Sequence, residues 1–176
     1  MVCFLGKGEV EMIKRYIDFD KLSLKQCENL FSYIFDYADS FTFRFPNVKY
    51  STSNTLSIKY DDTAQINNEF LDYIAKNNDL IGQCEKNLIK KSISNIYFND
   101  KYNNKSVIYN CRIFDELKKM IKLNPNLFEW IEPELPEDLS FHKKGKLFLY
   151  TCSHERLSII FCNDNKQADI ISKIVD

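Results

Sequence analysis

The sequence predicts an α+β fold in which a mostly antiparallel sheet of about five to seven strands is flanked by helices. Two observations lead to this prediction. Segments that alternate apolar and polar residues, as strands do, come in neighbouring pairs, and the helical patterns lie between these pairs. Helices do not follow every strand, as they would in a doubly wound parallel sheet.

One domain, covering residues 1–176, accounts for the whole chain. Its length of 176 residues suits a single domain. Its composition, 44% hydrophobic and 14% aromatic, is ample for one core. No low-complexity stretch, internal repeat or shift of composition marks a linker.

Helical spacing is clearest near the N-terminus. Residues 9–17 are expected to form a short helix, and a longer one is expected to begin at Ser23, which forms a capping-box pattern with Gln26. The longer helix places its apolar residues at i, i+3 and i+4, which are Leu24, Cys27, Leu30, Phe31, Ile34, Phe35 and Ala38. Such a stripe predicts core packing rather than a cofactor site.

The middle of the chain contains two predicted strand pairs. Phe41, Phe43 and Phe45 alternate with polar residues in a strand that Pro46 ends, and an antiparallel partner is expected over 56–60. Helices are expected over 64–76 and 80–91. The second pair is expected to run over 93–98 and 107–111, on either side of the turn-forming residues 99–104, and is followed by a helix over 114–123.

A hairpin is predicted around Gly145, which can adopt the positive φ that a tight turn requires. The alternation places one set of side chains on one face and the other set on the opposite face: Leu139, Phe141, Leu147 and Leu149 against Ser140, His142, Phe148 and Tyr150. His142 is therefore expected to face solvent. A last strand over 157–161 and a C-terminal helix over 168–175 complete the chain.

Charge and composition exclude several classes of function. The 24 basic and 25 acidic residues nearly balance, so the chain has no long-range attraction for nucleic acid, and nucleic acid is not an expected partner. No apolar run is long enough for a membrane span, and Met1–Leu5 is too short for a signal-peptide core, so neither a membrane nor secretion is expected. The six scattered Cys are expected to be reduced, mostly buried thiols of a cytoplasmic protein. Clustered metal ligands and Gly-rich phosphate loops are missing from the sequence, so we expect no metal and no cofactor.

The chemically distinctive residues gather in 127–161, which contains the only Trp and both His. Five carboxylates fall there within ten residues that contain no Lys or Arg: Glu129, Glu132, Glu134, Glu137 and Asp138. They lie beside Trp130 on a connector that Pro133 and Pro136 stiffen. An acidic rim around an aromatic anchor predicts a docking surface for a basic protein, so these five residues and Trp130 are the candidate partner-binding residues.

Ser153, His154 and Glu155 suggest a hydrolase triad, but adjacent residues on a strand point to opposite faces. We therefore expect a structural role in which Ser153 or Glu155 bonds the backbone, with a place on a binding surface or in catalysis as the alternatives. A second acid–base candidate is Glu137 or Asp138 with a histidine close to it across the sheet. The simpler reading is that Asp138 caps a turn.

The pattern of this region resembles a bacterial family of small uncharacterised proteins, over about the last third of the chain. The residues that carry the resemblance are Leu127-Phe128-Glu129-Trp130, Pro133, Pro136-Glu137-Asp138-Leu139, Phe141, Gly145 and Ser153-His154-Glu155. Family members often carry a sporulation-protein label, and some lie beside genes of polymorphic toxins. The resemblance implies an immunity role and no catalytic residues.

The expected function is therefore that of an immunity protein that binds and occludes a cognate toxin, for example a nuclease with a basic active-site groove. No catalytic activity is expected. Two alternatives stay open, a small hydrolase that uses His154 with Glu155 or Asp138, and a non-catalytic adaptor.

Overall fold

The computed structural model describes residues 12–46, 76–97, 105–131 and 134–176. The strands are β1 (Ile13–Tyr16), β2 (Ser40–Pro46), β3 (Leu88–Tyr97), β4 (Lys105–Arg112), β5 (Ser140–Lys143), β6 (Lys146–Cys152) and β7 (Leu157–Cys162). The helices are α1 (Leu24–Tyr37), α3 (Asn78–Lys86), α4 (Asp115–Leu123) and α5 (Asn165–Val175), with a 3-10 turn η1 (Leu127–Glu129).

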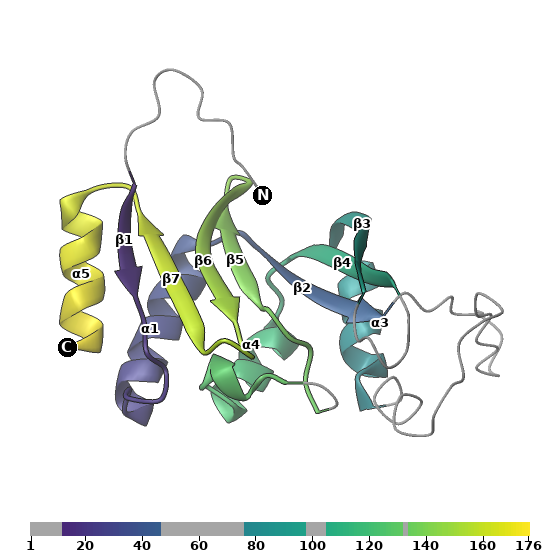
Figure 1. The fold of residues 1–176 in the computed structure, drawn as a ribbon, viewed down its shortest axis with the longest axis horizontal. Coiled ribbons are helices and arrows are strands. Elements are labelled where there is room, and N and C mark those ends of the chain that lie inside the picture. The colour runs from purple at the N-terminus through teal and green to yellow at the C-terminus, as the bar shows by residue number, and fades with distance from the viewer. Residues whose placement is uncertain (1–11, 47–75, 98–104, 132–133) are drawn as a thin grey trace, which may run out of the picture.

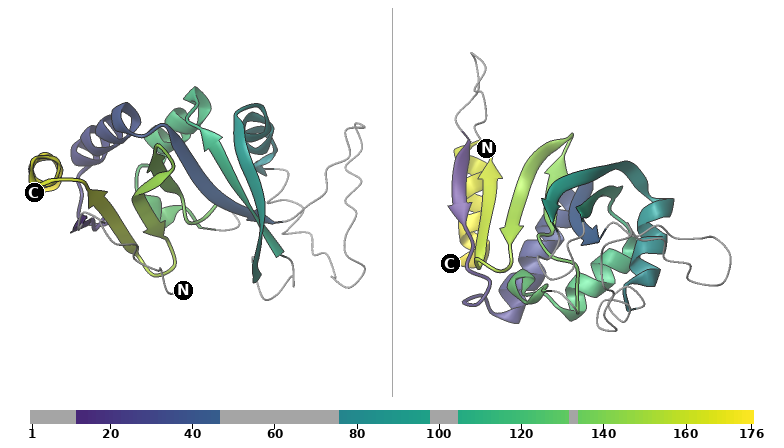
Figure 2. Two further views of the ribbon diagram at one scale, coloured as in Figure 1. Left: turned by 90° about the horizontal axis from the view of Figure 1, so that it is seen from above. Right: turned by 45° about the vertical axis from the view of Figure 1, so that its right-hand side comes forward.

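The seven strands form one sheet in the order β1-β7-β6-β5-β2-β4-β3, in which every neighbouring pair is antiparallel (Figure 1). The α+β fold with an antiparallel sheet is therefore confirmed. Helices α1, α4 and α3 lie along one side of this sheet (Figure 2, left), and α5 packs against α1 and β1 at one edge. The core lies between these helices and the sheet.

Helix α1 begins as the sequence predicts. The Ser23 hydroxyl accepts a hydrogen bond from the Gln26 amide, and the Gln26 side chain accepts one from the Ser23 amide at 2.9 Å. Both bonds satisfy amides that the first turn of a helix leaves without a partner. The helix buries Cys27, Leu30, Phe31 and Ile34 against the sheet.

Strand β2 lies inside the sheet and pairs with β4 over its whole length. Phe41, Phe43 and Phe45 are all buried, and the Phe43 ring stacks on Tyr109 of β4 with centroids 5.5 Å apart. The strand predicted here is confirmed. Its other neighbour is β5, and the partner predicted over 56–60 lies outside the described residues, as does nearly all of the helix predicted over 64–76.

Two helix predictions are wrong in part. Ile13–Tyr16, expected to belong to a helix over 9–17, form the edge strand β1, because their backbone pairs with β7 from the far end of the chain. The helix expected over 80–91 ends at Lys86, and Leu88 already begins β3. In both places the apolar spacing fits a helix and a strand alike, and pairing with a distant strand decides between them.

The hairpin between β5 and β6 is confirmed, with positive φ at Lys144 (49°) and Gly145 (75°). The predicted alternation is wrong beyond the turn, because a register shift follows Phe141 and moves Phe148 out of the pattern. Phe148 is buried, and its ring lies 4.5 Å from that of Tyr37 on α1. Leu147, predicted on the same face as Phe141, instead pairs with His142 and is half-buried.

Candidate functional site

The acidic connector, which we define as the described residues between 127 and 139, is fixed to the core at its start. Asn126 accepts a hydrogen bond from the Phe128 amide at 2.9 Å and so caps η1. The indole N–H of Trp130 donates to the Asn124 carbonyl at 2.8 Å, and only 1% of Trp130 is exposed. The expectation that Trp130 is an exposed anchor is therefore wrong. Since Phe128 is also fully buried, these two aromatic residues serve the core.

The turn between β6 and β7 holds this connector in place. The Ser153 side chain is buried, and its hydroxyl donates to the Leu127 carbonyl at 3.0 Å. At the other end of the connector, the hydroxyl of Thr151 on β6 donates to the Leu139 carbonyl. The expected structural role of Ser153 is confirmed, because its hydroxyl bonds the backbone instead of a histidine.

His154 and Glu137 meet across the gap between this turn and the connector. His154 Nε2 lies 2.8 Å from Glu137 Oε2, with 63% of the His154 side chain and 12% of the Glu137 side chain exposed. The sequence suggested Glu137 as one possible histidine partner, and the hydrolase alternative named Glu155 or Asp138 for His154. Glu137 and the neighbouring Pro136 are buried, so the prediction that Glu137 is part of an exposed rim is wrong.

Asp138 adopts a positive φ of 55°, a conformation that Asp tolerates in turns. One of its carboxylate oxygens lies 3.7 Å from Arg44 Nη1 on β2, and the other is buried without a hydrogen-bond partner. The carboxylate thus belongs mainly to the interior side of the connector. The prediction that Asp138 belongs to an exposed acidic rim is therefore wrong, because most of its side chain is buried.

The remaining described carboxylates of the connector are exposed. Glu129 pairs with Arg156 at 3.2 Å, and Glu134 pairs with Lys76 at 2.8 Å, while Glu132 lies outside the described residues. Arg156 also binds Asp20 through two of its nitrogens. This contact lowers the pKa of the Asp20 carboxyl and raises that of the guanidinium.

The reactive groups near the connector are poorly suited to nucleophilic attack. Cys152 is the half-buried thiol nearest the motif, and burial raises its pKa, while a hydrogen bond with the Glu155 backbone opposes this shift and the Asp138 carboxylate adds to it. A thiol must ionise to act as a nucleophile, so a raised pKa disfavours that role. Burial likewise raises the pKa of Tyr150 on the same strand. Among the described residues, no group of three or more His, Cys, Asp or Glu could hold a metal ion.

His142 lies on β5, half-buried, with its Nε2 3.0 Å from the Thr42 hydroxyl on β2. The prediction that His142 faces solvent is therefore only partly correct, because the neighbouring strand covers part of the ring. Loss of hydration lowers its pKa from the ordinary value of 6.5, and the Asp39 carboxylate opposes this shift.

We expect this lowered pKa to make the fold less stable in weak acid. Well above pH 6.5 His142 is neutral in both the folded and the unfolded chain, so it has no effect on the pH dependence there. As the pH falls below 6.5 the unfolded chain takes up the proton first, and the free energy of unfolding drops until the folded chain is protonated too. Urea unfolding of His142→Gln and wild-type protein between about pH 5 and pH 7.5 measures this difference. An unchanged pH slope in the variant would contradict the assignment.

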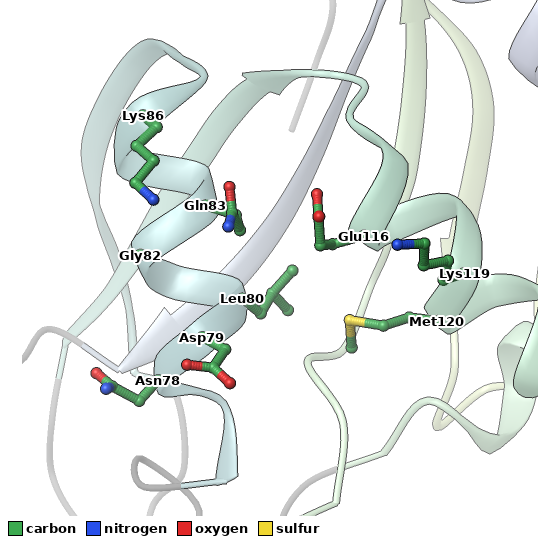
Figure 3. A pocket seen from close by; sticks show the side chains of 9 residues that line it. All are labelled: Asn78, Asp79, Leu80, Gly82, Gln83, Lys86, Glu116, Lys119 and Met120. Carbon is green, nitrogen blue, oxygen red and sulfur yellow. The ribbon is translucent and has the colours of Figure 1, made fainter.

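A groove of about 560 Å³ lies between α3 and α4, away from the motif residues (Figure 3). Its lining side chains come from both helices: Asn78, Asp79, Leu80, Gly82, Gln83, Lys86, Glu116, Lys119 and Met120. Leu80 and Met120 point toward each other across it, and charged groups stand along its rims (Figure 3). The groove could not be predicted from the sequence, because the two helices that form it are far apart in the chain.

Comparisons of this chain with protein-family models, with curated proteins and with solved structures found no match. Among the described residues, no helix has the length and apolar character that a membrane crossing requires.

Proposed function

We propose that this chain is a non-catalytic protein-binding domain, and most concretely an immunity protein that occludes a basic toxin with its acidic connector. The observation that carries the proposal is the division of the connector's carboxylates into two sets. Glu137 and Asp138 are largely buried and fix the connector, whereas Glu129 and Glu134 project from it with 63% and 68% of their side chains exposed.

Exposed ion pairs are worth about 0–1 kcal/mol, since water screens both partners. The pairs of Glu129 with Arg156 and of Glu134 with Lys76 are of this kind. A basic partner can therefore replace Arg156 or Lys76 at little cost. Because η1 and the β6–β7 turn hold the connector, the carboxylates are already ordered before binding, which reduces the entropy that association would cost.

The contacts of the motif residues also support binding over catalysis. Ser153 bonds the backbone and Glu137 is engaged by His154, so both form part of the scaffold. Cys152, two residues before the exposed His154, has a raised pKa that disfavours its ionisation. This arrangement fits the resemblance to immunity proteins, which implies a binding surface without its own reaction.

The test reverses the charge at the two exposed positions, Glu129 and Glu134, and leaves the buried carboxylates unchanged. Co-purification with the product of a neighbouring toxin gene would supply the partner, and stopped-flow association would then be compared for wild-type protein and Glu129→Lys/Glu134→Lys. We expect association to slow by about tenfold or more at low salt, with a smaller difference at high salt. Dissociation should change less, because rim charges act mainly on the encounter rate.

Asp169→Lys is the matched control, because this exposed α5 residue lies in a different part of the fold and forms no ion pair with another described residue. It changes the net charge in the same direction, so any general charge effect appears in both proteins. Equal association rates for the double variant and wild type would exclude the connector as the docking surface. Failure to bind any toxin would argue against the immunity role itself.

A further inference from the structure

The outward face of α3 carries four residues at helical spacing, Asp79, Gly82, Gln83 and Lys86. Positions i, i+3, i+4 and i+7 fall on one side of a helix, and all four residues line the groove between α3 and α4 (Figure 3). We call them the α3 stripe. Three of them are exposed and Gln83 is half-buried, so the stripe is accessible within the described structure.

Gly82 is the unusual member of the stripe. Glycine is less favourable than alanine inside a helix, because it has more backbone freedom to lose. A Cβ added at Gly82 would meet no atom within 4 Å, so no described neighbour requires its absence. A missing side chain on a helix surface permits the close approach of a second backbone. No described residue makes this approach at Gly82.

The two charges of the α3 stripe indicate which partner helix would be complementary to it. Asp79 and Lys86 are separated by nearly two helical turns, about 10.5 Å along the axis, and their midpoint lies between Gly82 and Gln83. Neither charge takes part in an ion pair within the described part of the chain. An antiparallel copy of α3, related by a two-fold axis at this midpoint, would place Asp79 against the Lys86 of the other copy, twice. Gly82 would face Gln83 at the centre of the contact.

We propose that the groove between α3 and α4 binds the α3 helix of a second copy of this chain, which gives a two-fold symmetric dimer. A two-fold interface must be complementary to itself, and the α3 stripe meets this requirement through its two opposite charges and its central glycine. The second α3 covers the apolar floor of Leu80 and Met120. The flexible Met120 side chain adapts readily to such a neighbour. The dimer is independent of the proposed toxin binding, and no toxin is needed to test it.

Sedimentation equilibrium over a range of protein concentrations measures the dimer. Asp79→Lys and Lys86→Asp, each made alone, place like charges opposite each other at both ends of the contact. We expect each to raise the dimer dissociation constant by about tenfold or more. The double variant Asp79→Lys/Lys86→Asp restores opposite charges and should return the dissociation constant toward that of wild type.

The stability of the monomer should not recover in the double variant. This difference distinguishes the proposed dimer contact from a purely structural role of Asp79 and Lys86. Asp79 lies in the first turn of α3 and Lys86 in the last, so each charge interacts favourably with the helix dipole and stabilises the helix. The double variant is therefore expected to be the least stable monomer while its dimer recovers. Gly82→Leu blocks the close approach and should abolish the dimer. The charge-matched pair Asp169→Lys/Lys173→Asp on α5 should leave it intact.

Three results would overturn the proposal. The first is a wild-type monomer up to about 1 mM, beyond which association is too weak to matter. The second is a dimer that the single charge reversals do not weaken or that the double variant does not restore, since then another surface makes it. The third is a monomer whose thermal stability falls in Gly82→Leu, because the groove would then be filled by another part of the same chain.

Discussion

Trp130→Ala should lower the free energy of unfolding by about 3–5 kcal/mol, the range for removing a large buried aromatic side chain. Only 1% of Trp130 is exposed, and the indole N–H donates to the Asn124 carbonyl at 2.8 Å. The substitution would leave a cavity under the connector and a carbonyl without its donor. Because Trp130 is the only Trp in the chain, far-UV circular dichroism in urea is the suitable probe.

Trp130→Phe is the matched control, since it retains an aromatic ring and removes the N–H donor. Its cost should be smaller, about 1–3 kcal/mol, which is the penalty for leaving a buried polar group without a partner plus some loss of packing. A Trp130→Ala protein of nearly unchanged stability that bound its partner more weakly would contradict the structure. It would return Trp130 to the role of an exposed anchor that the sequence suggested.

The elements with strong local signals were the ones predicted correctly. The Ser23 capping box, the alternating Phe residues of β2 and the Gly145 turn each depend on neighbours within a few residues, so the sequence contains what determines them. Strand β1 and the start of β3 depend instead on pairing with distant strands. The same apolar spacing is compatible with either element until that pairing is known.

The candidate site shows the same division between local and distant information. The sequence located the connector and the β6–β7 turn, and it correctly gave Ser153 a structural role. It could not show which carboxylates are buried, because the hydrogen bond from Ser153 to Leu127 and the pair between His154 and Glu137 each join segments far apart in the chain. Charge alone therefore overstated the acidic rim. Of its described carboxylates, only Glu129 and Glu134 are mostly exposed.

The junction between the two halves of the sheet leads to a second large effect. Strands β2 and β5 pair over just three residues, Ser40 to Thr42 on β2, yet they join β1-β7-β6-β5 to β2-β4-β3. Phe141 lies at the middle of this pairing, opposite Phe41, and is fully buried. Its ring also meets Phe35 of α1 edge-on, with centroids 6.0 Å apart. The junction thus depends on one aromatic cluster more than on its short ladder of hydrogen bonds.

Phe141→Ala should therefore lower the free energy of unfolding by about 3–5 kcal/mol and loosen one half of the sheet from the other. Hydrogen exchange should become faster in β4 than in β7, because β4 is the direct neighbour of the junction strand β2, whereas β6 separates β7 from the junction strand β5. Phe148→Ala is the matched control, since Phe148 is equally buried but packs on Tyr33 and Tyr37 of α1. It should destabilise the fold without selectively exposing β4. If both variants accelerated exchange uniformly over the sheet, the two halves would unfold as one unit, and the junction would have no special weight.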